Sequence, residues 1–324
     1  MKKVFAGTLL CTFASIANAQ SNITVYGLID TGFGSRNGGN YEGGPATFAA
    51  TDNGNSSSMF GFKGTEDLGG GMQANFKLEE GFHPNTGANK AGTAFNREAW
   101  VGLSGNFGQF RAGLQDSTVD LVLGQYDLNW GPNITSSYGN LGLQAIYDVS
   151  YGTQRPSQIQ YWTPKFGGFS AQLGFIPRSA ITLSKPQNVY QVGANYVIGH
   201  FSVGAAYESA HADSSSLRAN WGTSAKYDFG PFVVSTNYYS NAVKANGQGY
   251  GAGVMVPIGT TFDVGTQVAH NTGVNGTAWE LFSHYYLSKR TSFYAYYGGM
   301  NNNAQIFDKA TKGSSYVAGI IHKF

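Results

Sequence analysis

Apolar and polar side chains alternate over several segments of about ten residues, and this period of two is the strongest constraint on the fold. In residues 72–79 the apolar side chains hold the even positions, and polar or charged side chains hold the odd positions. Residues 169–175 repeat the alternation, with apolar side chains at odd positions. Successive side chains of a β-strand point to opposite faces, so the pattern predicts strands with one apolar and one polar face. A helix would need an apolar residue at every third or fourth position, which these segments lack.

Turn-forming stretches of two lengths separate these segments. Short stretches such as residues 66–71 are rich in glycine, whereas residues 35–55 and 301–313 are long and polar. A membrane-spanning barrel alternates tight turns at one end with longer loops at the other. Counting segments from Ile23 to Phe324 predicts about sixteen antiparallel strands in one domain, an even number that leaves an aqueous channel inside.

Composition excludes the two other common classes of protein. Only 12% of the residues are charged, whereas aromatic residues reach 15% and the chain contains 46 glycines. A water-soluble globular domain has about twice that share of charged residues. A helical membrane protein needs runs of about twenty apolar residues, and none occurs after Gln20. The remaining class is an all-β, transmembrane antiparallel β-barrel, in which a wet interior dilutes the apolar outer residues.

The N-terminal residues have the organisation of a bacterial secretory signal peptide. Two lysines precede an apolar run over residues 4–16, and Ala19 ends an Ala-x-Ala sequence. This arrangement is typical of a signal peptidase site, and the run is too short for a membrane anchor. We therefore expect cleavage after Ala19, which divides the chain into a signal peptide, residues 1–19, and a barrel domain, residues 20–324, that begins at Gln20.

Cys11, the only cysteine, lies within this predicted signal peptide. A lipoprotein would require a small residue before its modified cysteine, but Leu10 stands there, which disfavours that alternative. The mature chain therefore lacks thiols for disulfides, metal binding or catalysis. Removal of the two lysines of the signal peptide lowers the number of basic residues from 20 to 18, equal to the 18 acidic residues. A net charge of zero predicts no nucleic-acid partner.

One connection is far longer than the rest. Residues 116–153 separate a strand ending near Gln115 from one starting near Gln154, and loops of that length without secondary structure are uncommon. The segment contains several apolar residues, namely Val119, Leu121, Val122, Leu123, Leu128 and Trp130. We expect these side chains to pack against the barrel wall from inside. The alternative is an outward-facing loop that recognises a partner, which would make the chain an adhesion or binding barrel.

No catalytic or metal-binding pattern is present in the sequence. The six histidines are scattered, none at a spacing that suits a catalytic triad or a metal site, and no Gly-x-Ser-x-Gly sequence occurs. A hydrolase site on the outer wall would need a nucleophile, a histidine and an orienting group. We therefore expect no enzymatic activity, no cofactor and no metal.

Five segments, in the right order, resemble the trimeric general porins of Gram-negative bacteria, in particular their β-proteobacterial branch. These segments are residues 23–30 (ITVYGLID), 60–71 (FGFKGTEDLGGG), 95–105 (FNREAWVGLSG), 159–169 (IQYWTPKFGGF) and the terminal Phe324. The resemblance covers the whole mature chain. It implies a sixteen-stranded barrel that assembles as a homotrimer in the outer membrane, in contact with lipid and lipopolysaccharide. Phe324 resembles the signal that the barrel-assembly machinery reads.

The same resemblance implies that the third external loop folds into the lumen and forms a constriction, with acidic residues facing basic residues of the wall. Ions and small hydrophilic solutes then diffuse passively, and the size and charge of the constriction set a weak selectivity. Lys63, Arg97 and Arg155 are the candidate basic residues, although Arg155 stands one position out of register. Met59 occupies a position where these porins often have arginine. Alternation along the strand places Met59 and Lys63 toward the lumen.

Asp127 is the candidate loop acid that faces these cations, with Asp120 and Asp116 behind it. Residues 130–132 (WGP) stand where the family usually has Pro-Glu-Phe-Gly-Gly, so the path of the loop departs from the family pattern.

Each candidate also has a simpler interpretation. Lys63 could neutralise the acidic residues of the next turn, Arg97 could pair with Glu98, and Asp127 could cap a helical turn. The candidate cations outnumber the clear loop acid, so we expect a weak preference for anions. A channel selective for one anionic substrate is the alternative function within the same fold.

Overall fold

The computed structural model describes residues 22–36, 49–52, 54–90, 92–129, 133, 135–141, 143, 154–301 and 313–324. The predicted signal peptide with Ala19, the following Gln20 and the loop residue Trp130 lie outside these residues.

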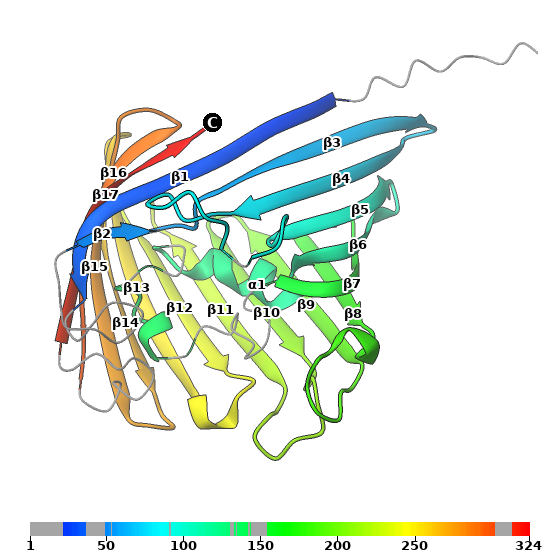
Figure 1. Ribbon diagram of the computed structural model, residues 1–324. Coiled ribbons are helices and arrows are strands. Elements are labelled where there is room, and N and C mark those ends of the chain that lie inside the picture. The colour runs from blue at the N-terminus through cyan, green and yellow to red at the C-terminus, as the bar shows by residue number, and fades with distance from the viewer. Residues whose placement is uncertain are drawn as a thin grey trace, which may run out of the picture.

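Within the described residues, seventeen strands form one antiparallel sheet that curves around a common interior (Figure 1). The strands are β1 (Asn22–Arg36), β2 (Ala49–Asp52), β3 (Met59–Gly69), β4 (Met72–Gly81), β5 (Glu98–Gly105), β6 (Gly108–Asp116), β7 (Gln154–Trp162), β8 (Phe169–Ile176), β9 (Val189–Ile198), β10 (Phe201–Glu208), β11 (Asn220–Asp228), β12 (Val233–Ser240), β13 (Gln248–Ile258), β14 (Phe262–Asn271), β15 (Gly276–Tyr286), β16 (Thr291–Met300) and β17 (Gly313–Lys323).

The sheet closes on itself through β1. The first part of β1, residues 22–28, pairs with β3, and the second part pairs with β17. β2 pairs with β1 beyond the end of β3, so these two strands form one interrupted line of the wall. The wall is therefore a closed sixteen-stranded barrel, which confirms the predicted architecture. At the closure, Gly27 and Phe324 exchange backbone hydrogen bonds of 3.1 and 3.0 Å. A Cβ at Gly27 would lie 2.2 Å from the Phe324 ring and 2.8 Å from the backbone oxygen of Met59, so a larger residue here would displace the terminal ring.

Strand residues alternate between the outside of the barrel and its interior. On β14 and β15, Val268, Trp279 and Leu281 are 47%, 37% and 48% exposed, whereas Gln267 and Glu280 are buried. The apolar residues provide the lipid-facing surface that a barrel needs. The predicted period of two is thereby confirmed. No helix among the described residues is long and apolar enough to cross a membrane.

The connection between β6 and β7, residues 117–153, is termed the inward loop because its described part lies inside the barrel. Its described part contains α1 (Thr118–Leu123) and two 3₁₀ turns, η1 (Gly124–Tyr126) and η2 (Gly139–Leu141). Figure 1 shows α1 within the ring of strands.

Apolar packing holds α1 against the inner face of β8–β11. Val119, Val122 and Leu123 are at most 1% exposed. Ser117 caps the helix, because its hydroxyl accepts a hydrogen bond of 3.1 Å from the backbone N–H of Asp120. The prediction that these apolar residues pack inside the barrel is confirmed, and the described part of the loop does not face outward.

Glycines on the inner faces of the strands make room for this loop. A Cβ at Gly193 on β9 would lie 2.7 Å from the Val122 side chain. On β13, a Cβ at Gly251 would lie 2.5 Å from Tyr138 in the second half of the loop. Contacts this short do not occur between real side chains, so the loop fits only where the wall has no Cβ.

Candidate functional site

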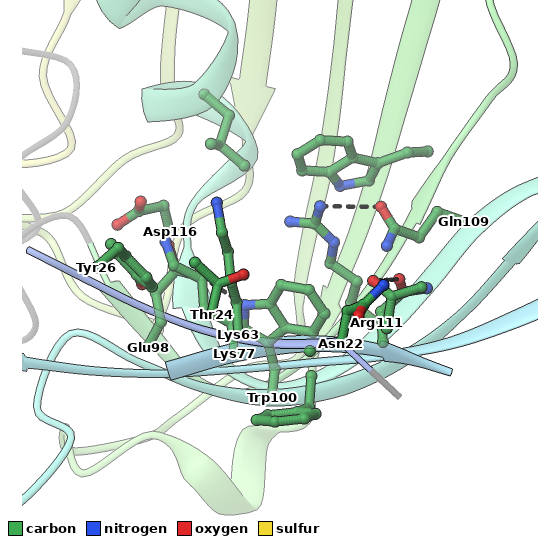
Figure 2. Close-up of a pocket in the computed structure, with 16 residues that line it drawn as sticks. Asn22, Thr24, Tyr26, Lys63, Lys77, Glu98, Trp100, Gln109, Arg111 and Asp116 are labelled. Carbon is green, nitrogen blue, oxygen red and sulfur yellow. Dashed lines mark hydrogen bonds and ion pairs between the residues drawn. The ribbon is translucent and has the colours of Figure 1, made fainter. Parts of the chain in front are cut away.

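A cavity of about 720 Å³ lies between α1 and the inner faces of β1 and β3–β7. Figure 2 shows side chains from these strands converging on it. Three basic and two acidic residues line the cavity: Lys63, Lys77, Arg111, Glu98 and Asp116. The formal charge of this lining is therefore +1. The described residues hold no group of three or more His, Cys, Asp or Glu that suits a metal ion.

Lys63 projects from β3 into this cavity, beside Tyr26 on β1. Its Nζ lies 5.2 Å from the centre of the Tyr26 ring, which is a cation–π distance. The side chain is exposed, and no described carboxylate lies within ion-pair distance of it. The simpler interpretation, a pair with the acidic residues of the next turn, is therefore not seen among the described residues.

Carboxylates of β4 and β5 neutralise the two neighbouring cations. Arg97 Nε lies 2.6 Å from Glu79 Oε1. Lys77 Nζ lies 3.0 Å from Glu79 Oε2 and 2.7 Å from Glu98 Oε1, and the Tyr26 hydroxyl donates to Glu79 at 2.8 Å. Arg97 thus pairs with a residue across the β4–β5 contact rather than with Glu98, its neighbour in sequence.

Arg111 is a basic residue of the cavity that is not among the candidates predicted from the sequence. Its guanidinium lies between two indole rings, with Cζ 4.3 Å from the centre of Trp100 and 3.8 Å from the centre of Trp162. Its Nη2 donates to Gln109 Oε1 at 2.9 Å. The alternation of polar and apolar residues over 109–115 is the signal that places Arg111 toward the lumen.

Arg155, at the start of β7, is fully buried and does not line the cavity. Its guanidinium binds both carboxylate oxygens of Glu208 on β10, at 3.1 and 3.0 Å. Glu208 also contacts His211 at 2.9 Å and accepts a hydrogen bond from Gln191 on β9. Gln191 in turn accepts from the backbone N–H of Thr118 at 2.9 Å. Arg155 therefore belongs to a buried network that joins the wall to the first residue of α1.

Of the two other predicted loop acids, Asp116 lines the cavity and Asp120 lies in the first turn of α1. Gln154 Nε2 donates to Asp116 Oδ1 at 2.7 Å. Burial raises the pKa of Asp120 well above its usual range, and the negative charge of Asp116 raises it further, although Arg155 and Arg97 act in the opposite direction. Asp120 thus favours the neutral, protonated form more than an ordinary aspartate does.

Asp127 follows η1 and contacts the wall opposite the cavity. Its Oδ1 accepts hydrogen bonds from Gln267 Nε2 on β14 at 2.7 Å and from the backbone N–H of Asn129 at 3.1 Å. Burial raises the pKa of Asp127 to about 6. Gln267 also donates to Glu280 on β15 at 3.2 Å. The described partners of Asp127 are therefore polar groups of β14 and of its own turn, not Lys63 or Arg97.

Glu280 on β15 binds the second half of the inward loop. The alternation along the strand predicts that its side chain points into the barrel, but not which groups it binds. Its carboxylate accepts hydrogen bonds from Asn129 Nδ2 at 2.8 Å and from the backbone N–H of Ser137 at 3.0 Å. Nearby, Asn271 Nδ2 on β14 donates to the backbone oxygen of Leu141 at 2.9 Å. Buried polar groups of the wall are thus satisfied by the loop.

Met59 places an apolar side chain on the inner face of β3. It is partly buried and packs, with Leu128 of the inward loop, against an apolar cluster of Leu28, Phe282, Tyr294, Tyr296, Val317 and Ile321. This position therefore contributes packing and no charge.

The sequence model of the Gram-negative porin family matches residues 6–305. The chain belongs to the Gram-negative porin family. It is 26% identical over 390 aligned positions to an outer membrane porin protein of Bordetella pertussis, with 100% of both chains covered. It is 29% identical over 338 positions to outer membrane porin protein 32 of Delftia acidovorans, covering 99% of this porin and 95% of that one. The solved anion-selective porin from Comamonas acidovorans superposes with a TM-score of 0.76 at 25% identity, covering 94% of this porin and 100% of that chain.

The fold and the family together establish the cellular location and the general activity of this porin. It lies in the bacterial outer membrane, which its strands span, and forms a water-filled channel for passive diffusion of ions and small hydrophilic solutes.

Proposed function

We propose that this porin is a homotrimeric diffusion channel with a weak preference for anions, set where α1 faces the inner sides of β3–β6. The observation that supports the sign is the lining of the cavity, in which three basic side chains outnumber two acidic ones. The structural neighbour named as an anion-selective porin supports the same sign. Charged groups at a narrow, water-filled passage act on each ion that passes, so a small excess of one sign is enough for a preference.

The predicted constriction residues divide into two roles in this proposal. Lys63 supplies positive charge on the wall of the cavity, whereas the charge of Arg97 is neutralised by Glu79. Asp116 is the acid of the cavity lining, and Asp120 on α1 favours the neutral form. Arg155 and Asp127 act as positioning residues, because their hydrogen bonds lead to the wall and the loop backbone rather than to the cavity. The loop position then determines the width of the passage.

Export and assembly complete the proposal. Residues 1–19 act as a signal peptide cleaved between Ala19 and Gln20, and the terminal Phe324 is read by the barrel-assembly machinery. The end with the short turns faces the periplasm, as in other outer-membrane barrels. Exposed apolar residues of the outer wall then contact lipid and the other two subunits, and the long-loop end contacts lipopolysaccharide. The proposed activity is transport without catalysis.

Single-channel recording of the refolded protein in a planar lipid bilayer tests this function. We expect large, persistent conductance steps that arrive in groups of three, as three connected pores insert together. A reversal potential measured under a KCl gradient on the same membrane gives the sign of the selectivity, and the cavity lining predicts the anion side.

Two results would oppose the proposal in different ways. A reversal potential of the cation sign would overturn the anion preference but would leave the open-channel function intact. A silent bilayer, with protein that is folded by its heat-modifiable mobility in gel electrophoresis, would overturn the open channel and favour a plugged or adhesive barrel.

A further inference from the structure

The guanidinium of Arg111 is stacked between the indole rings of Trp100 and Trp162 on the inner wall of the barrel. Both faces of the guanidinium are covered by indole rings, at 4.3 and 3.8 Å from Cζ to the ring centres. Stacking of this kind holds the plane of an arginine in place without neutralising its charge. The stack therefore fixes the orientation of the edge of the Arg111 guanidinium at strands β5–β7 of the wall.

The hydrogen-bond donors of this guanidinium are mostly unused by the protein. Arginine has five N–H donors, and in the described structure Arg111 uses one of them, from Nη2 to Gln109. The Nε donor is shielded from solvent and has no partner. Three donors therefore remain on Nη1 and Nη2, and Arg111 lines the cavity. No carboxylate of the described residues lies within ion-pair distance of it.

The other arginines around the inward loop differ in this respect. Arg97 is paired with Glu79 and Arg155 with Glu208. Among the lysines of the cavity, Lys77 contacts two carboxylates, whereas Lys63 has none within the described part of the chain. Arg111 and Lys63 are thus the cavity cations whose charge remains available to a solute.

We propose that the stacked Arg111, assisted by Lys63, is a docking subsite for small oxyanions, in which a carboxylate or phosphate group binds the guanidinium edge. This proposal rests on the proposed open channel and adds a specific, saturable binding step to it. The planar fork of an arginine matches two oxygens of a carboxylate or phosphate group, whereas a spherical halide gains no such fit. A cavity of about 720 Å³ has room for such a solute.

The acidic residues of the cavity limit the affinity without removing the subsite. Glu98 is bound by Lys77 at 2.7 Å and accepts a hydrogen bond from the Trp100 indole N–H. Asp116 accepts a hydrogen bond from Gln154 at 2.7 Å. Both carboxylates are therefore engaged by other residues, and weak binding with fast release is what a channel requires.

The test is block of the chloride current by inorganic phosphate, and in a separate series by acetate, in single-channel recordings. We expect the chloride conductance of the unsubstituted porin to fall saturably with either anion. Arg111→Gln should raise the half-blocking concentration about tenfold, the size expected for loss of a charged hydrogen bond. Arg111→Lys should also weaken the block, because lysine keeps the charge but lacks the planar guanidinium that stacks and offers two parallel N–H donors.

Arg178→Gln is the matched control. Arg178 is exposed in the external turn after β8, so this variant removes the same charge outside the cavity. It should leave the half-blocking concentration unchanged. Equal block in the unsubstituted porin and in Arg111→Gln, or full block in Arg111→Lys, would overturn the subsite and leave the channel function intact.

A second measurement detects binding at the subsite without recording conductance. Phosphate bound at the edge of the stack should change the tryptophan fluorescence of the refolded protein in detergent, saturably, and Arg111→Gln should abolish that change. A silent bilayer together with this fluorescence response would therefore reject the open channel and keep the subsite. Absence of the response in folded, unsubstituted porin would reject the subsite.

Discussion

The inner wall of the barrel consists of two unlike regions. Along β8–β16 the described part of the inward loop covers the wall, with α1 against β8–β11 and η2 near β14 and β15. Tyr138 lies against Gly251 on β13, and Thr135 lies against Gly298 on β16. Along β1 and β3–β7 the wall is open, and its charged side chains line the cavity. The covered region uses glycines, buried amides and carboxylates to hold the loop, whereas the open region presents cations and aromatic rings.

This difference assigns separate tasks to the two regions. Polar side chains of the covered wall form hydrogen bonds with the loop, as Glu280 does with Asn129 and Ser137. Such contacts hold the loop against the wall, and in the proposed channel the position of the loop sets the width of the passage. Side chains of the open wall determine what charge a solute meets. Substitutions in the first region should change stability and channel width, and those in the second should change selectivity.

Arg155→Met should have the largest effect on stability, because it leaves the buried Glu208 without its cation. Both side chains are 0% exposed, and removal of one partner of a buried pair costs about 3 to 5 kcal/mol. We expect a loss of that size in the free energy of unfolding, measured by urea titration of the protein in detergent micelles. The current should also become noisier, because Glu208 binds Gln191, which holds α1.

The double variant Arg155→Met with Glu208→Leu is the control for this prediction. It removes both charges, so most of the stability should return. If Arg155→Met alone changed the free energy of unfolding by less than about 1 kcal/mol, the size of an ordinary substitution, the buried network would not be what holds the covered region together.

The strands and the partners of the charged side chains differ in how far the sequence predicts them. The period of two is a local property, so the strands, their faces and the inward direction of Glu280 follow from the sequence. The inward loop is predictable because apolar side chains such as Val119 and Val122 need a surface to cover them.

The partners of the charged residues depend instead on which strands meet and in what register. Arg155 binds Glu208, which stands 53 positions away, and Arg97 binds Glu79 rather than the adjacent Glu98. Trp162 reaches Arg111 only because β6 pairs with β7 after the whole inward loop. No local pattern encodes these distances, so the sequence identifies candidate cations but not which of them are neutralised.

A change of pH should alter the docking of the inward loop through Asp127, with an effect smaller than that of Arg155→Met. Its pKa is raised to about 6 by burial, above the usual value of about 3.9 for aspartate. The docked loop therefore binds this proton more tightly than the undocked loop. The resulting stabilisation is fully present below about pH 4 and is lost as the pH rises through about 6. We expect less current noise at pH 5 than at pH 7.5.

Asp127→Asn isolates this contribution. The amide cannot titrate, so the noise of the variant should respond less to pH than the noise of the unsubstituted porin. An unchanged pH response in Asp127→Asn would assign the effect to another group and break the link between this carboxyl and loop docking.

Lys63→Gln should have the smallest effect, confined to the open region. It removes one exposed positive charge from the cavity, and at 0.1 M salt the field of such a charge decays over about 10 Å. We expect the reversal potential under a KCl gradient to shift toward the cation side, with conductance noise and urea stability unchanged. Lys289→Gln, on the exposed turn between β15 and β16, removes the same charge outside the cavity and should shift it less. Equal shifts in both variants would mean that selectivity follows the net charge of the whole barrel, and the separation between an open selective wall and a covered structural wall would fail.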